Sequence, residues 1–273
     1  MSILEQLGSD IVKLWNTYAS IYLTGMWKTV SLAVICTLVG CLIGFLCGVL
    51  QTIPVAKKDN PLKKGFLAVL RGIIRAYVEV FRGTPMILQA VFVYYGLPYF
   101  TNNAVQWKSV WLAAFVVVAV NTGAYMAETV RGGILSVDPG QTEGAKAIGM
   151  THWQTMTSVI LPQALRSILP QIGNNFIINL KDTSVMFIIG YTDFFATHKA
   201  VVGATFLYFP SASIEMVGYL FMTLVSSVLL RWWEKRMDGD ASYDLATTDT
   251  LAHTSGMVRF PQKNDALQDE RGR

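Results

Sequence analysis

The chain has 273 residues, of which 52% are hydrophobic and only 15% are charged, and its formal net charge is +4. Soluble domains carry about a quarter charged residues, so this composition excludes an ordinary soluble protein and indicates a polytopic membrane protein. The basic residues lie in segments between apolar runs. That placement sets membrane topology and gives no reason to expect a nucleic-acid partner.

Residues 1–24 open the chain with an amphipathic pattern. Ile3, Leu7, Ile11 and Leu14 recur at helical spacing, with polar residues between them. The pattern predicts an external amphipathic helix, which either lies on the outer membrane surface or packs against the membrane helices.

Five apolar runs follow between residues 25 and 236, which we expect to form one transmembrane domain. A helix needs about 20 apolar residues to cross a bilayer, and only a helix satisfies the backbone of such a segment in lipid. The sequence therefore predicts an all-α integral membrane protein with five transmembrane helices. They are expected at residues 27–53, 85–100, 110–130, 170–191 and 214–233, the second being short.

The first apolar run carries a ladder of glycines, Gly40, Gly44 and Gly48. Small residues four apart on a membrane helix let a neighbouring backbone approach closely. We interpret the ladder as a packing surface for another helix.

The basic residues predict the orientation in the membrane. Of the 22 Lys and Arg residues, all but Lys13, Lys28, Lys108 and Lys199 fall on one side of the expected spans. Cytoplasmic loops carry the excess of Lys and Arg, so the N-terminus is expected outside and the C-terminus in the cytoplasm. The polar tail, residues 237–273, is then cytoplasmic, and its composition is typical of a disordered segment.

Segment 131–170 is longer and more polar than an ordinary loop between membrane helices, and the same bias makes it cytoplasmic. Asp138-Pro139-Gly140 predicts the end of the preceding helix and a turn, and residues 141–148 can form about two helical turns. Gly149 is expected to end this short helix as a C-terminal cap with a positive φ.

A second helix is expected to begin at Thr151, and Pro162 and Pro170 are expected to kink or break it. A short helix held between two rigid helices could act as a lever. The alternative is a plain interfacial loop.

The spacing in this segment has a counterpart in a known family. Glu143-Gly144-Ala145 is followed after three residues by Gly149, and after nine more by Val159-Ile160-Leu161-Pro162. This resembles the "EAA" loop of the membrane subunits of bacterial ATP-driven importers, with Gly144 and Val159 in place of Ala and Ile. In that family the loop forms a short helix that docks into a groove of a separate ATPase. The resemblance implies that Glu143, Gly144, Ala145 and Gly149 couple this chain to such a subunit.

Further segments resemble the polar amino acid branch of these importers, over about residues 27–233. The branch implies a type I ABC importer fold in a prokaryotic plasma membrane. It also implies four kinds of neighbour: an ATPase dimer that carries ATP and Mg, an identical or similar second permease subunit, an external solute-binding protein, and the lipid bilayer. The segments are EVFRGTPMILQ at 79–89, YYG at 94–96, AYMAETVRGGI at 124–134, PGQ at 139–141, GNNF at 173–176 and LKDTS at 180–184.

Polar residues inside membrane spans are costly and often functional. Two helical faces carry them, namely Asn121, Tyr125 and Glu128 on the third run and Asn175, Asn179 and Asp182 on the fourth. Facing stripes of this kind suit a small zwitterion. The alternative is a structural network in which the amides bridge helices and Lys181 pairs with Asp182 or Glu128, and for Glu128 and Lys181 we favour this structural role.

The resemblance implies that Asn175 and Asp182, helped by Asn121, hold an amino acid. We add Asn179 and Tyr125 to the candidate substrate-binding residues, since they share the same faces. Relatives that carry cationic amino acids often have a carboxylate at the position of Asn175. The amide here favours a neutral or acidic substrate, such as glutamine or glutamate.

Motifs for catalysis are missing from the sequence. It contains no G-x-x-x-x-G-K-[ST] phosphate loop and no H-E-x-x-H pair, and its three histidines, His152, His198 and His253, are expected in loops or the tail. The three cysteines share one apolar run without metal spacing. We therefore expect a non-catalytic permease subunit that binds no metal or cofactor itself.

A secondary amino acid transporter is the alternative, although it needs its own ion site and usually an inverted repeat, and no repeat is visible. A membrane enzyme is a third, weaker class.

Overall fold

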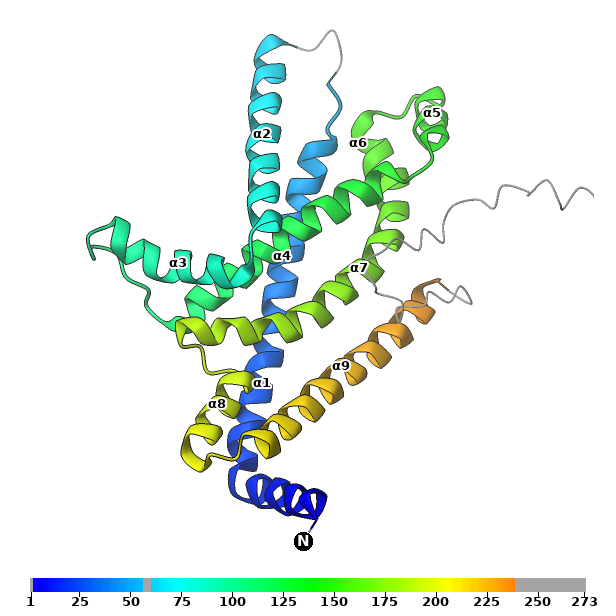
Figure 1. The fold of residues 1–273 in the computed structure, drawn as a ribbon. Helices are drawn as coiled ribbons and strands as arrows, with labels where there is room; N and C mark the ends of the chain where they lie inside the picture. Colours follow the sequence, from blue (N-terminus) through cyan, green and yellow to red (C-terminus); the bar gives the residue numbers. More distant parts are fainter. Residues whose placement is uncertain (1, 56–59, 239–273) are drawn as a thin grey trace, which may run out of the picture.

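The computed structural model describes residues 2–55 and 60–238. Their regular secondary structure is entirely helical, with no strand among the described residues. The elements in chain order are α1 (Ile3–Thr52), α2 (Pro61–Gly83), α3 (Met86–Phe100), α4 (Val110–Leu135), α5 (Pro139–Ala147), α6 (His152–Thr155), the π-helical turn η1 (Met156–Ile160), α7 (Leu161–Asp182), the 3-10 segment η2 (Thr183–Ile189), α8 (Phe194–Thr205) and α9 (Tyr208–Asp238) (Figure 1). Apart from its first two residues, which end α9, the expected tail 237–273 lies outside the described residues.

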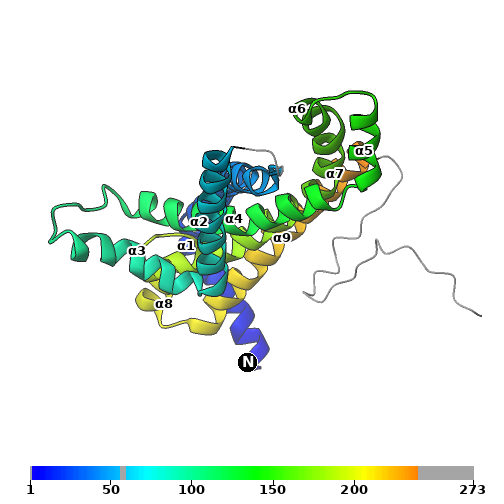
Figure 2. The ribbon, with the colours of Figure 1, turned by 90° about the horizontal axis from the view of Figure 1, so that it is seen from above.

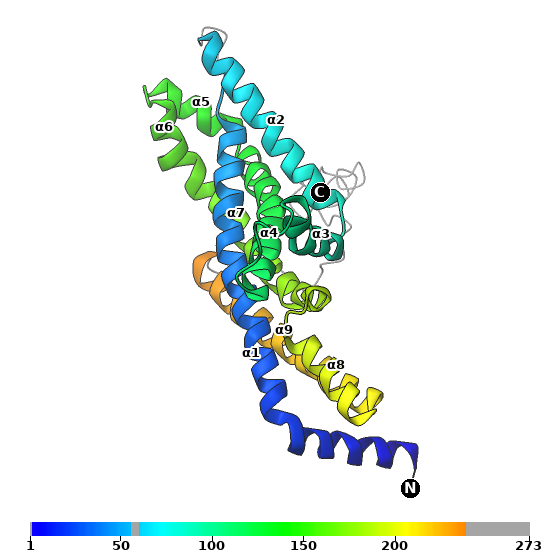
Figure 3. The same ribbon diagram turned by 90° about the vertical axis from the view of Figure 1, so that its left-hand side faces the viewer.

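The expected N-terminal helix and first span form one continuous helix, α1, which begins at a capping box between Ser2 and Glu5. Figure 3 shows its first turns bending away from the remainder. Leu14 and Tyr22 are buried in a cluster with Phe194 of α8 and Ile214 of α9. The second half of this segment therefore packs against other helices, whereas Ile3 and Leu4 at its start are exposed.

The glycine ladder of α1 packs against α4, as the sequence predicts. A Cβ built on any of the three glycines would come within 3 Å of a side chain of α4, closer than real side chains tolerate. The facing pairs are Gly40 with Thr122, Gly44 with Met126, and Gly48 with Val130. This seam makes α1 and α4 the centre of the fold, where they cross in Figure 1.

The predicted count of five spans is not confirmed. Three helices in the described residues are long and apolar enough to cross a membrane, namely α1, α4 and α9. A fourth span is possible only if the segment His152–Ile189 and α8, which meet at a bend of 52°, count as one broken span. The second expected run corresponds to α3, whose 15 residues are too few to cross a bilayer unaided.

The two prolines behave differently. Pro162 occupies the first turn of α7, directly after the π-helical turn η1, so the expected irregularity falls there. Pro170 lies inside α7 and is buried, and the helix continues for twelve residues beyond it. The prediction of a break at Pro170 is therefore wrong. Irregular or kinked helices are tolerated where neighbouring helices satisfy the freed backbone groups, and Figure 1 shows α7 as a curved helix.

The elements that matter for function lie at separate places. Figure 1 shows α5 and α6 at one end of the molecule, and α8 with the start of α1 at the other. Seen from above in Figure 2, α3 projects on the side away from α5 and α6. Between the two ends, the junction of α2 and α3 lies against α4.

Candidate functional site

The short helix α5 is built by local capping. The Asp138 carboxylate accepts a hydrogen bond from the backbone N–H of Gly140 at 2.7 Å, and Pro139 is the first helical residue, where its missing N–H costs nothing. The helix thus begins two residues earlier than the sequence predicted, because Pro139 is its first residue rather than part of the preceding turn.

Gly149 ends α5 with φ +83°, and the predicted positive φ is confirmed. Its N–H donates to the carbonyl of Lys146 at 3.0 Å, and the N–H of Met150 donates to that of Ala145 at 3.0 Å. These two bonds form a Schellman motif, which needs a left-handed residue at the position of Gly149. Thr151 then caps α6 in a reciprocal box with Gln154.

The candidate coupling residues face different ways. Glu143, Gly144 and Gly149 are exposed, whereas Ala145 is only 6% exposed and turns toward the protein. Two large apolar side chains lie beside them: Ile148 is 80% exposed and Trp153 is 73% exposed. Such exposure on a polar segment is a usable signal of a docking surface.

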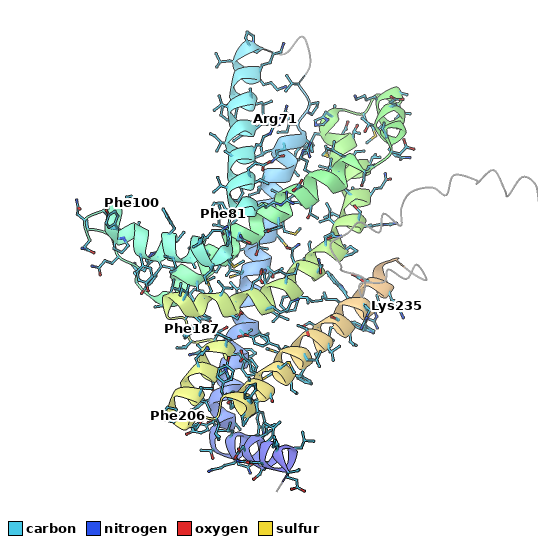
Figure 4. All side chains as sticks on the ribbon, viewed as in Figure 1. Arg71, Phe81, Phe100, Phe187, Phe206 and Lys235 are labelled. Carbon is cyan, nitrogen blue, oxygen red and sulfur yellow. The ribbon has the colours of Figure 1, made fainter. Side chains whose placement is uncertain are left out.

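A cavity of about 670 Å³ lies between the α2–α3 junction, α4, α7 and the start of η2. Figure 4 shows this region near the label of Phe81, where α2, α3 and α4 meet. All five predicted substrate-binding residues line it, namely Asn121, Tyr125, Asn175, Asn179 and Asp182. The two polar stripes read from the sequence therefore meet at one cavity.

Asn121 is almost fully buried and anchors the α2–α3 junction on α4. Its amide donates to the Gln89 Oε1 atom at 2.9 Å and to the Phe81 carbonyl at 3.1 Å. Gln89 in turn donates to the carbonyl of Thr84 at 2.9 Å. The amide hydrogens of Asn121 are thus committed to shaping the wall of the cavity.

Asn179 is likewise buried and joins three helices. It donates to the Thr37 hydroxyl of α1 at 2.9 Å and accepts from the Thr122 hydroxyl of α4 at 3.1 Å. The bridging role that we considered as the alternative accounts for these contacts.

Asn175 and Asp182 are more accessible to the cavity. Both are partly exposed, and the Asn175 amide donates to the Gln171 carbonyl of its own helix at 2.9 Å. Tyr125 is 41% exposed. These three side chains are therefore the ones placed to touch a bound molecule.

Arg82 is the site residue that the sequence analysis missed. It lines the cavity, its guanidinium lies 5.3 Å from the centre of the Tyr125 ring, and it forms an ion pair with Glu128. The alternative in which Glu128 pairs with Lys181 is wrong, because Glu128 pairs with Arg82 in the last turn of α2. Arg82 stands directly before the Gly-Thr-Pro sequence in segment 79–89, and this position was the available signal.

The histidines do not form a site. His152 begins α6, and His198 lies within α8 and is buried, so the expectation of loops is wrong for both. His253 lies outside the described residues. Among the residues that the structure describes, no group of three or more His, Cys, Asp or Glu side chains could hold a metal ion.

Comparison with known proteins decides the family. Residues 64–239 match the family described as "Binding-protein-dependent transport system inner membrane component". The chain belongs to this family. It is therefore a membrane component of an ABC importer and a non-catalytic permease subunit, with ATP hydrolysis on a separate chain, and a secondary transporter is not supported.

Several relatives are similar over most of their length. The glutamine transport system permease protein GlnP of Escherichia coli K12 is 40% identical over 161 residues, which cover 59% of this chain and 73% of the relative. The nopaline transport system permease protein NocM of Agrobacterium fabrum is 32% identical, over 74% of this chain and 86% of the relative.

A solved structure of an amino acid ABC transporter with histidines matches this chain with a TM-score of 0.70 and 33% identity. The match covers 81% of this chain and 95% of that one. The MetNI methionine ABC transporter matches at a TM-score of 0.60 with 19% identity, which speaks for the fold alone. The fold is thus that of a type I ABC importer permease, as the sequence predicts.

Proposed function

We propose that this permease carries polar amino acids, with glutamine or glutamate as the best-fitting substrates. The observation that supports this most directly is the composition of the cavity wall, which contains the carboxylate of Asp182, the guanidinium of Arg82 and the amide of Asn175. The similarity to a glutamine permease points the same way.

An amino acid zwitterion has a charge to match each of these groups. Its ammonium pairs with Asp182 and its carboxylate with Arg82, both as charge-assisted hydrogen bonds. The amide of Asn175 donates to or accepts from a polar side chain. It has no charge to pair with a guanidinium, so it disfavours arginine.

Coupling is assigned to α5. We propose that Glu143, Gly144 and Gly149 face a groove of an ATPase subunit, and that Ala145 holds the helix against its own chain. ATP and Mg belong to the ATPase dimer, and this chain holds no cofactor. Transport requires that ATP favour one of two states of the membrane bundle, which the lever-like α5 transmits.

The assembly follows from the size of the chain. One such bundle is too small to enclose a path, so we propose that an identical or similar second permease subunit completes it, with an external solute-binding protein delivering substrate. The proposed orientation places the N-terminus outside and the C-terminus in the cytoplasm of a prokaryotic cell. The proposed spans are α1, α3, α4, the α7–η2 segment and α9, with α3 completed by the end of α2.

The experiment is ATP hydrolysis by the importer reconstituted in vesicles with its ATPase and binding protein. Glutamine and glutamate are expected to stimulate hydrolysis more than arginine, lysine or leucine. A stronger response to arginine or lysine contradicts the substrate assignment, and a lack of response to every amino acid contradicts amino acid transport.

A further inference from the structure

Arg82 lies at the boundary between two cavities. It lines the cavity of about 670 Å³ together with Asp182, and also a smaller one of about 150 Å³. The smaller cavity is rich in charge. Its lining comprises Gln51, Arg75, Val78, Glu79, Arg82, Glu128 and Arg131. Glu128, the ion-pair partner of Arg82, lines only the smaller of the two.

The Arg82–Glu128 ion pair is accessible at both ends. The side chains are 41% and 49% exposed, respectively. An ion pair with this much exposure contributes little net stability, because water competes for both groups. A second carboxylate that enters the larger cavity can therefore compete with Glu128 for the guanidinium.

Once a bound carboxylate has displaced Glu128 from Arg82, two other cationic side chains are available to pair with Glu128. Arg75 of α2 and Arg131 of α4 line the same small cavity. Meanwhile Arg82 retains the ring of Tyr125 on one side. The exchange replaces one carboxylate by another at Arg82, so it preserves the charge balance of the site.

The pair also connects the cavity to the coupling helix. Arg82 lies in the last turn of α2, whereas Glu128 lies about two turns before the end of α4. Only Ser136 and Val137 separate α4 from Asp138, the cap of α5. The ion pair thus adds a contact between α2 and the last turns of α4 to the packing of Ile74 and Val78 against Ala127, close to the segment that we assign to the ATPase.

We propose that Arg82 is an exchange residue, which pairs with Glu128 in the empty permease and with the α-carboxylate of a bound amino acid in the loaded one. Loading then removes this one contact between α2 and the last turns of α4, the helix that leads to α5. This proposal rests on the proposed function, since it requires an amino acid in the larger cavity.

The test measures, by calorimetry, the affinity of two probes for the purified permease complex in lipid nanodiscs without the binding protein. The probes are L-glutamine and L-glutaminamide, which lacks the carboxylate. Glu128→Gln removes the competitor, so we expect glutamine to bind about two- to fivefold tighter, the range that corresponds to an exposed ion pair. The affinity for L-glutaminamide is expected to stay unchanged.

Matched variants separate this exchange from a change in local charge. Glu79→Gln removes the same charge from the same small cavity without touching the pair, and it should leave both affinities at the wild-type value. Arg82→Gln should weaken glutamine binding at least tenfold and leave L-glutaminamide unaffected, and Arg82→Lys should restore part of the loss.

The outcomes are distinct. Equal glutamine affinity in the wild type and Glu128→Gln, or the same gain in Glu79→Gln, overturns the exchange alone. A gain for L-glutaminamide as large as that for glutamine also overturns it, because the carboxylate would then play no part. If the wild type binds no amino acid, the proposed function fails as well.

Discussion

Gly44 of α1 lies directly against Met126 of α4, since a Cβ built on Gly44 would come within 2.3 Å of the Met126 Cβ atom. Gly44→Ala is therefore expected to force the two helices apart and to destabilise the protein by about 1–3 kcal/mol, as overpacking does. The thermal midpoint of the purified chain in detergent measures the loss. Gly65→Ala in α2 is the control, because a Cβ there meets nothing within 4 Å. An equal midpoint for the two variants would contradict the close approach.

Two glycines of the coupling segment make a matched pair. A Cβ on Gly144 or Gly149 meets nothing within 4 Å, but only Gly149 has a positive φ, +83°. Gly144→Ala should keep uptake near the wild-type level, because alanine favours a helix interior. Gly149→Ala should strain the Schellman motif by about 1–2 kcal/mol and lower uptake several-fold at equal membrane insertion.

Uptake and ATP hydrolysis in the same vesicles decide what the coupling glycine does. If hydrolysis persists while uptake falls in Gly149→Ala, the end of α5 transmits the ATP-driven conformational change to the membrane helices. If both variants transport alike, the left-handed cap has no role in coupling.

The proposed orientation can be tested by cysteine labelling. A cysteine in place of the buried His198 would be out of reach of a labelling reagent. Two exposed alanines serve better: Ala104 in the α3–α4 loop and Ala147 at the end of α5. With the three native cysteines replaced by alanine, Ala104→Cys should react with an impermeant reagent in whole cells. Ala147→Cys should react only after lysis, because the basic bias places α5 inside. The reverse pattern would invert the topology.

Ser211 joins two buried polar side chains at the far end of the molecule from α5. Its hydroxyl lies 2.6 Å from the Tyr22 hydroxyl and 2.8 Å from the Nδ1 atom of His198. Ser211→Ala removes a hydrogen bond from each partner, while the Glu215 carboxylate remains 3.6 Å from His198 Nδ1, and it should cost about 1–3 kcal/mol of unfolding free energy. Ser213→Ala is the control, because Ser213 bonds only to the Phe209 carbonyl of its own helix. Equal loss in the two variants would argue against the network.

Local chemistry explains why the coupling segment was predictable. The cap at Asp138, the left-handed Gly149 and the new start at Thr151 each depend on residues within a few positions of one another. Rules for caps act over that range, so the sequence alone predicts them. The glycine ladder was predictable as a close contact, although its partner helix, α4, was not.

Long-range pairing explains what could not be predicted. The pair of Arg82 and Glu128 links residues 46 positions apart, and Asn179 bonds to Thr37 across 142 positions. Helical spacing places the polar residues on common faces, but it does not show which amides form hydrogen bonds between helices. The count of spans is not confirmed for a different reason: α3 is short, and the region after α7 bends, so hydropathy alone does not define its crossings.

The last prediction concerns selectivity. Asn175 and Asp182 lie seven residues apart, about 10.5 Å along α7, so they can hold opposite ends of one amino acid. Asn175→Glu supplies a carboxylate where the wild type has an amide. A charge-assisted hydrogen bond is about twice as strong as a neutral one, so the preference for arginine over glutamine should rise about fivefold or more. Glutamate should bind more weakly through repulsion.

Asp182→Asn provides the contrasting variant. We expect it to weaken every amino acid alike, because the ammonium that Asp182 meets is common to all of them. Binding is measured on the purified membrane complex without the external binding protein, which otherwise filters substrates first. An unchanged ranking of arginine, glutamine and glutamate in Asn175→Glu would remove Asn175 from the binding site. A selective loss in Asp182→Asn would mean that Asp182 contacts the substrate side chain, and the two residues would then exchange their assigned ends of the amino acid.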